Sequence, residues 1–122
     1  MSTRPEIELA LDVRSYERIV VLSSPDSPHE YPESWVKPQK AGDLGQIDAE
    51  TIVVVDRVEI QRPTLAAIGE RGPRLIAFAP QGVDQEKSMR RMLTTLFPWA
   101  EVWTLFTAFG KVLVTKDARH LK

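Results

Sequence analysis

Three short apolar runs constrain the fold of this chain more than any other feature of its sequence. They are residues 18–23 (RIVVLS), 51–56 (TIVVVD) and 74–79 (RLIAFA). Each run is continuously apolar and bounded by polar residues, as expected of a strand that is covered on both faces. Such strands are typical of parallel sheets, so the sequence predicts an α/β fold around a central parallel sheet.

Helical patterns follow the second and third runs. Residues 63–71 carry Leu65 and Ile68 on one helical face and end at a Gly-Pro stop. In residues 84–97, which Asp84 could cap, apolar side chains recur at the spacing of one helix face. We expect this stripe to pack in the core, and it consists of Met89, Met92, Leu93, Leu96 and Phe97.

The two ends of the chain complete the expected sheet. Residues 5–14 alternate like a strand, but Pro5 and the abundance of helix formers favour a helix, which we expect. Residues 101–107 and 111–115 read as a closing pair of strands, with Gly110 permitting the turn. We therefore predict a three-layer Rossmann-like sheet, mostly parallel, with helices on both faces and a C-terminal antiparallel hairpin.

Length and composition narrow the classes of function. A chain of 122 residues fits a single domain, 1–122, interrupted by a Pro-rich loop at about 24–46. Its 16 basic and 17 acidic residues give a net charge of -1, which argues against binding to nucleic acid or an anionic membrane. Cysteine is absent, and no signal peptide or long apolar span is apparent, so we expect a soluble cytoplasmic protein.

Several segments, in order, resemble one enzyme family. LFPWAEVWTLFTAFGKVLVTKD is similar to the closing hairpin of class I S-adenosylmethionine-dependent methyltransferases, and of their spermidine synthase branch in particular. ELALDVRSYERIVVLSS resembles the helix and first strand of that family. WVKPQKAGDLGQIDAETIVVVDRV resembles the stretch that ends in its fourth strand, and LAAIGERGPRLIAFAP its next helix and strand. The resemblance implies a reduced methyltransferase-like architecture.

The chain departs from this family at the cofactor loop. The stretch Leu22-Ser23-Ser24-Pro25-Asp26-Ser27 follows the first strand without a glycine, where the family has a glycine-rich turn. The family's second strand, with its acidic end, cannot be found in the short interval before the next apolar run. We therefore expect no bound cofactor and no methyl transfer.

If cofactor binding were retained, three residues would carry it. The resemblance places Ser24 after the first strand and Asp43 near the adenine ring, while Asp56 follows the strand where catalytic residues often lie. The alternatives are an ordinary loop turn for Asp43 and a capping or salt-bridging role for Asp56.

Other chemistries find less support. His29 and His120 do not have the spacing of a zinc site, so we expect no metal. Ser23, Ser24 and Asp26 near His29 lack the strand-turn-helix elbow that a hydrolase of the Gly-x-Ser-x-Gly type needs. A phosphoacceptor role for Asp56 would need an acidic pair after the first strand, where serines stand instead. The basic helix face that contains Lys87, Arg90 and Arg91 has acidic neighbours and reads as a solvated surface.

Aromatic residues gather in the Pro-rich loop and the final hairpin. They either fill the core or form a protein interface, because the edge of a shortened sheet must be covered or paired. The candidate interface residues are Tyr31, Trp35, Trp99, Trp103, Phe106 and Phe109.

The sequence thus favours a non-catalytic methyltransferase-like domain that binds a protein partner, acts as a scaffold or self-associates. One alternative is a minimal S-adenosylmethionine-dependent methyltransferase or spermidine synthase relative, completed by a partner subunit. Another is a small-ligand sensor that uses the crevice around Ser24, Asp43 and Asp56.

Overall fold

The structure is a computed structural model of the whole chain. The residues that it describes are 13–14, 16–23, 31, 34–37, 47–58, 60–98, 101–107 and 110–115. The helix expected at 5–14 lies outside these residues except for Val13 and Arg14, which are not helical. Most of the Pro-rich loop also lies outside them.

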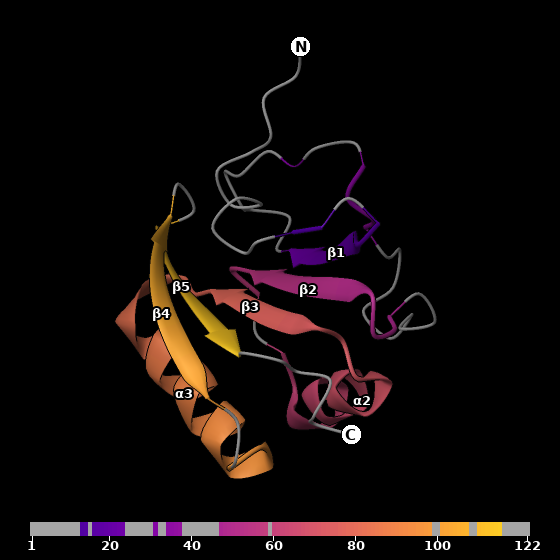
Figure 1. Cartoon of the computed structure of the whole chain (residues 1–122). Coiled ribbons are helices and arrows are strands. Elements are labelled where there is room, and N and C mark those ends of the chain that lie inside the picture. Colours follow the sequence, from indigo (N-terminus) through magenta and orange to yellow (C-terminus); the bar gives the residue numbers. More distant parts are fainter. Residues whose placement is uncertain are drawn as a thin grey trace.

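Five strands form one mixed sheet in the order β1-β2-β3-β5-β4 (Figure 1). The strands β1 (Arg18–Ser23), β2 (Thr51–Asp56) and β3 (Leu75–Ala79) are parallel and correspond to the three apolar runs. The strands β4 (Val102–Thr107) and β5 (Gly110–Thr115) form the predicted hairpin. Its second strand, β5, lies antiparallel between β3 and β4, which confirms the prediction of an antiparallel addition to the sheet.

Two helices, α2 (Arg62–Arg71) and α3 (Gly82–Leu96), pack on the same face of the sheet (Figure 1). Leu65 and Ile68 of α2 and Met89 and Leu93 of α3 join one core cluster with side chains from β1, β2, β3 and β5. Phe97 belongs to the same cluster, and the partly buried Met92 and Leu96 pack against it, which confirms the core stripe. Within the described residues, neither helix has the length and apolar character needed to cross a membrane.

The opposite face of the sheet carries a second core cluster. Its core cluster contains Val13 and Trp35 with Tyr31 packed against it, and no helix from the described residues contributes to it. The expectation of helices on both faces is therefore not met by the described part of the chain. Among the described residues, aromatic side chains of the Pro-rich loop pack on this face.

The ends of the helices follow from local chemistry. Pro63 lies in the first turn of α2, and Gly72 ends that helix with φ 65°, a left-handed conformation that glycine adopts without steric cost. Helix α3 begins at Gly82, two residues before the predicted cap. Gln81 is the N-cap residue and Asp84 lies in the first turn, so the prediction of Asp84 as the cap is wrong. The backbone N–H of Gln81 donates to Gln85 Oε1 at 2.6 Å, a contact from the first turn back to the N-cap residue.

The Pro-rich loop also contacts the edge of the sheet. Val36 forms an isolated parallel bridge with Val20 of β1. The Val36 N–H donates to the Ile19 carbonyl at 2.8 Å, and the Val21 N–H donates to the Val36 carbonyl at 2.9 Å. The loop thereby pairs with the outer edge of β1 at its middle.

Candidate functional site

The carboxyl ends of the three parallel strands meet at one edge of the sheet. Ser23, Asp56 and Ala79 end β1, β2 and β3, and the register places Asp56 beside both of the others. In sheets of this kind, ligands bind beyond the carboxyl ends of the strands. Asp56 is therefore where the fold would place a functional carboxylate, but its side chain is buried, with an exposed fraction of 0%.

Tyr31 of the Pro-rich loop encloses Asp56. Its hydroxyl donates a hydrogen bond to Asp56 Oδ2 across 25 positions of sequence. The Tyr31 ring stacks on Trp35, with the centroids 5.7 Å apart and the planes 23° from parallel. Lys37 Nζ lies 4.9 Å from the centroid of the same ring, within the range of a cation–π contact. Two residues of the loop thus contact the tyrosine ring, while its hydroxyl reaches β2.

Arg57 turns the backbone away from the sheet directly after Asp56. Its φ of 56° is left-handed, the only positive φ at a non-glycine residue in the described part of the chain. The Arg57 N–H donates to the Ala79 carbonyl at 2.8 Å, which closes the end of β2 against β3. A strained residue of this kind costs free energy and persists because its surroundings fix it. The result is a buried carboxylate at the end of β2.

The other residues predicted for cofactor binding cannot be placed beside Asp56. Ser24 and Asp43 lie outside the described residues. No three His, Cys, Asp or Glu side chains in the described part of the chain are grouped so that they could hold a metal ion. His29 and His120 also lie outside it.

The predicted interface residues separate into three groups. Trp35 is buried, with 5% of its surface exposed, and the half-buried Tyr31 packs against the same cluster. On β4, Trp103 and Phe106 are exposed at 47% and 81%. Trp99 and Phe109 lie outside the described residues. The use of any of these residues as an interface stays a prediction.

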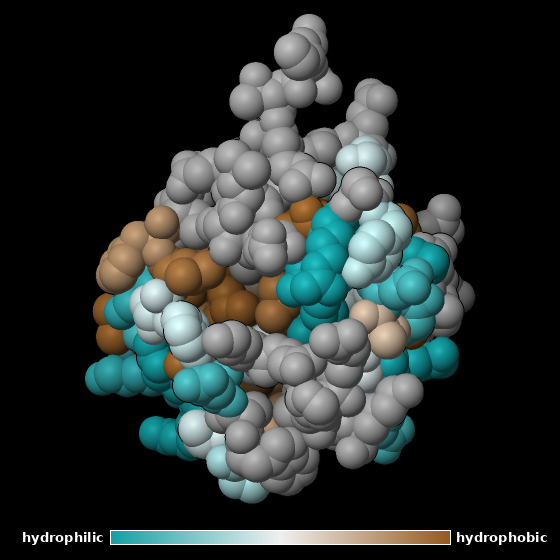
Figure 2. Space-filling model, in the orientation of Figure 1, coloured by the Kyte–Doolittle hydropathy of each residue, from teal (hydrophilic) through white to brown (hydrophobic). Residues whose placement is uncertain are grey.

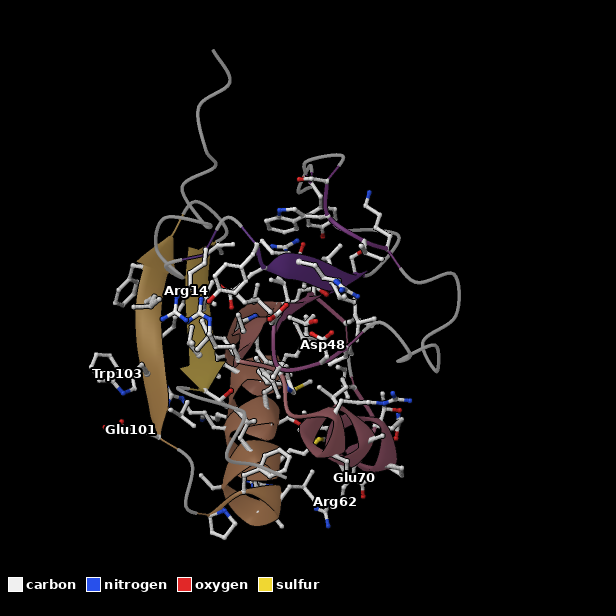
Figure 3. All side chains as sticks on the ribbon, turned by 45° about the vertical axis from the view of Figure 1, so that its right-hand side comes forward. Arg14, Asp48, Arg62, Glu70, Glu101 and Trp103 are labelled. Carbon is white, nitrogen blue, oxygen red and sulfur yellow. The ribbon has the colours of Figure 1, made fainter. Side chains whose placement is uncertain are left out.

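Strand β4 forms the exposed apolar end of the sheet. Figure 2 shows hydrophobic surface gathered where β4 and β5 lie in Figure 1. The Trp103 side chain projects away from the protein body (Figure 3). Leu105 packs against the cluster on the helix-free face, whereas Val102 packs against the cluster beneath the helices. Side chains of β4 therefore alternate between the two faces, and both faces carry apolar groups.

Polar contacts fasten α3 to this hairpin. Arg90 Nη2 donates to Thr104 Oγ1 at 2.6 Å, and Lys111 Nζ lies 3.0 Å from Glu86 Oε1. The hydrogen bond from Lys111 is the main reason why the pKa of Glu86 is below its ordinary value, and burial opposes it. The basic face of α3 was predicted to be a solvated surface. Lys87 and Arg91 are exposed as predicted, but Arg90 bonds to the sheet.

A buried ion pair near the amino ends of the parallel strands was not predicted from the sequence. Arg74, which precedes β3, donates from Nη2 to Glu17 Oε1 at 2.8 Å and from Nε to Oε2, and Glu17 precedes β1. The exposed side-chain fractions are 10% for Arg74 and 1% for Glu17. Burial raises the pKa of Glu17, but hydrogen bonds from Arg74 and from the Arg14 backbone outweigh it and lower the pKa overall. No local pattern links the two residues, which are 57 positions apart.

The Glu17–Arg74 pair spans the amino ends of the parallel strands, while Asp56 lies at their carboxyl ends. Arg74 also donates its backbone N–H to the Thr51 carbonyl at 2.9 Å, so the pair bridges over β2. This bidentate pair links the segments that precede β1 and β3.

No family model, no curated protein and no solved structure matches the chain. The conclusion at this point is a small α/β domain with a mixed five-stranded sheet and an enclosed carboxylate where the fold would place a ligand.

Proposed function

We propose that this chain is a non-catalytic, methyltransferase-like domain that serves as a protein-binding, scaffolding or assembly module. The strand order supports the first half of the proposal. Strand β5 lies antiparallel between β3 and β4, which is the ending implied by the resemblance of the hairpin segment to class I methyltransferases. The three parallel strands would then correspond to the family's first, fourth and fifth strands.

The enclosure of Asp56 carries the second half of the proposal. A methyltransferase of this fold would bind its cofactor beyond the carboxyl ends of β1 and β2. There, Asp56 is fully buried and accepts a hydrogen bond from Tyr31, which stacks on the buried Trp35. A ligand that took the place of the tyrosine at Asp56 Oδ2 would have to break this hydrogen bond and this packing. The absence of a glycine from the loop after β1 points the same way.

The enzyme alternative makes a different demand on the same residues. A partner subunit that completed the site would have to withdraw Tyr31, so that Asp56 became available to a substrate or cofactor. The energetic cost of that rearrangement includes the lost hydrogen bond to a buried carboxylate, about 1–3 kcal/mol. The sensor alternative requires the same opening, because it uses the same carboxylate.

The test is calorimetric titration of the purified full chain with S-adenosylmethionine and with its demethylated product, up to millimolar concentration. We expect no heat above dilution, while circular dichroism shows that the protein is folded. Saturable binding that is weakened by Asp56→Ala or Asp43→Ala would refute the non-catalytic assignment. Asp48→Ala is the matched control, because the Asp48 side chain is 54% exposed and precedes the amino end of β2.

A variant sharpens this experiment. Tyr31→Phe removes the hydroxyl that reaches Asp56 and keeps the ring that stacks on Trp35. We expect this variant to be less stable by about 1–2 kcal/mol in urea unfolding and still to bind no S-adenosylmethionine. If Tyr31→Phe bound the cofactor when the natural chain did not, the tyrosine would be a gate and the enzyme alternative would take precedence.

A further inference from the structure

We infer that the outer edge of β4 pairs antiparallel with β4 of a second copy of this chain, with a two-fold axis at Thr104. The two sheets would then continue as one across the interface. This inference rests on the proposed assembly function and specifies its partner and surface.

Exposed apolar side chains of the described residues gather at the β4 edge of the sheet. Four large hydrophobic side chains are exposed in the described part of the chain: Tyr16, Val83, Trp103 and Phe106. Trp103 and Phe106 belong to β4 itself. Val83 lies on α3, three and seven positions before Glu86 and Arg90, which contact the hairpin, so helix geometry places it on the same side. Trp103 and Phe106 lie on opposite faces of the strand, so exposed apolar groups flank this edge on both sides.

The sequence of β4 lacks the devices that keep an edge strand from pairing. The strand reads VWTLFT, with no charge, proline or glycine in it. Among the described residues, β4 pairs with β5 alone, and no strand covers its other side. The edge of β1 differs, because Val36 of the loop bonds to it on that side. Within the described residues, one edge of the sheet is thus paired with the loop, and the other edge is the apolar strand β4.

The backbone register shows which residues of β4 offer their hydrogen-bonding groups to a partner. Thr107 pairs with Gly110, so two residues separate the strands of the hairpin. The pair that flanks a two-residue turn exchanges its backbone hydrogen bonds, and bonded pairs alternate with non-bonded pairs along an antiparallel ladder. By this alternation, every second residue of β4 directs its N–H and C=O outward. These residues are Val102, Thr104 and Phe106.

An axis at Thr104 satisfies all of these outward groups. Thr104 then faces its own copy, and Val102 faces Phe106 of the second copy, so each outward residue exchanges hydrogen bonds with another. On the opposite face, Trp103 lies across from Leu105 of the second copy. Each exposed apolar side chain of the strand meets an apolar partner, and cross-strand aromatic–aliphatic pairs of this kind are stabilising. The strand is therefore complementary to itself in one register.

Neighbouring registers fit less well. An axis at Trp103 would set the Glu101 carboxylate against Leu105, and an axis at Leu105 would leave Val102 without a partner in the strand. With the axis at Thr104, Glu101 lies opposite Thr107, so no two like charges of the strand face each other. Arg90 approaches the axis through its bond to Thr104, but its charge is accompanied by Glu86, whose Oε2 lies 3.4 Å from Arg90 Nε.

The first experiment measures the mass of the full chain by light scattering and its dimer dissociation constant by sedimentation. We expect a dimer that Phe106→Lys weakens by roughly 100-fold, because a symmetric interface contains the change twice and each copy removes one buried aromatic contact. Tyr16→Lys is the matched control: Tyr16 is 61% exposed but precedes β1, far from β4 in the sheet order, so we expect it to leave the dimer unchanged.

The second experiment tests the register by cross-linking. The chain contains no cysteine, so single cysteines can be introduced without background. Under mild oxidation, Thr104→Cys should form a covalent dimer, since residues that face each other across strands have Cα atoms about 5.5 Å apart, within disulfide range. Neither Val102→Cys alone nor Phe106→Cys alone should form a covalent dimer, because position 102 of one copy faces position 106 of the second copy. The doubly substituted chain, with both changes, should cross-link.

The outcomes separate this inference from the proposed function. A folded monomer at all concentrations, or a dimer that Phe106→Lys leaves intact and Thr104→Cys does not cross-link, overturns the pairing of β4. If that chain also fails to bind S-adenosylmethionine, the non-catalytic assignment stands and another partner must be sought. A dimer with the expected cross-links that nevertheless binds S-adenosylmethionine supports the pairing and overturns the non-catalytic assignment.

Discussion

Replacing Glu17 with glutamine tests the buried ion pair and has a magnitude that the structure allows us to work out. Glu17 accepts two hydrogen bonds from the Arg74 guanidinium and one from the Arg14 backbone N–H, the last at 2.9 Å. Removing one partner of a buried pair costs about 3–5 kcal/mol, because the other charge stays buried. The glutamine carbonyl can still accept one bond, which restores about 1 kcal/mol. We expect a loss of about 3 kcal/mol at neutral pH.

The pH dependence of this loss follows from the lowered pKa of Glu17. Burial raises that pKa, but the hydrogen bonds and charges of Arg74 and Arg14 lower it by more. The unfolded chain therefore binds a proton at Glu17 at a higher pH than the folded chain does. The stabilisation is complete above the unfolded value of about 4.3 and is lost as the pH falls through the lower, folded value. The difference between the natural chain and Glu17→Gln should shrink in this acidic range.

Urea unfolding followed by tryptophan fluorescence measures the effect, since Trp35 is buried in the folded state. With a slope of roughly 2 kcal/mol per molar urea for a domain of this size, the midpoint should fall by about 1.5 M. Glu70→Gln is the control, because Glu70 is exposed on α2 (Figure 3). A loss below about 1 kcal/mol at neutral pH, or a loss that is the same at pH 7 and pH 3, would contradict the reasoning.

A double substitution separates charge from packing. Replacing Glu17 with leucine and Arg74 with methionine removes both charges and keeps apolar bulk at the amino ends of the strands. Well-packed apolar residues often match a buried ion pair in stability. We therefore expect the double variant to be more stable than Glu17→Gln alone, and a lower stability would show that the pair itself is required.

Three further predictions concern the core and the hairpin. A Cβ on Gly69 would lie 2.6 Å from Phe97 Cζ, so we expect Gly69→Ala to lower the free energy of unfolding by about 1–2 kcal/mol despite its helix propensity, and Phe97→Leu to relieve the clash. The buried Thr115 hydroxyl accepts a hydrogen bond from the Ile76 N–H and donates one to the Ile76 carbonyl. Thr115→Val should therefore lower the free energy of unfolding by about 1 kcal/mol in the same urea assay, and an unchanged midpoint would contradict this. Lys111→Met should raise the pKa of Glu86 toward its ordinary value in an NMR titration, because the hydrogen bond from Lys111 is the main cause of the lowering; an unaltered titration would show that this bond is not formed in solution.

The strands were predictable because their cause is local. Strands β1 and β2 coincide with the apolar runs, and β3 begins one residue later than its run, at Leu75. Arg74, the first residue of that run, lies outside the strand. Its guanidinium donates to the Glu17 carboxylate, and its backbone N–H donates to the Thr51 carbonyl. Helix α2 was predicted within one residue because proline and glycine mark its ends. A continuous apolar run carries enough information to place a central strand.

The candidate site was less predictable because its contacts join distant residues. Asp56 could be placed at a strand end from the sequence, but the tyrosine that encloses it comes from a loop with no periodic pattern. The packing of Tyr31 and Trp35 on the second sheet face was likewise beyond local reasoning, because neither residue belongs to a periodic pattern. Such contacts depend on the order of the strands, and that order emerges only when the whole sheet is assembled.

The insertion of β5 has a consequence for how the chain is made on the ribosome. It is the last of the described strands in chain order, yet it lies inside the sheet, between β3 and β4. During synthesis, β3 must therefore wait with an unpaired edge until residues 110–115 have emerged, and β4 cannot join the sheet before then. Nascent chains that pause within this interval expose two apolar strand edges at once, a state prone to aggregation. A stop codon before β5 would remove an interior strand, and its product should be insoluble.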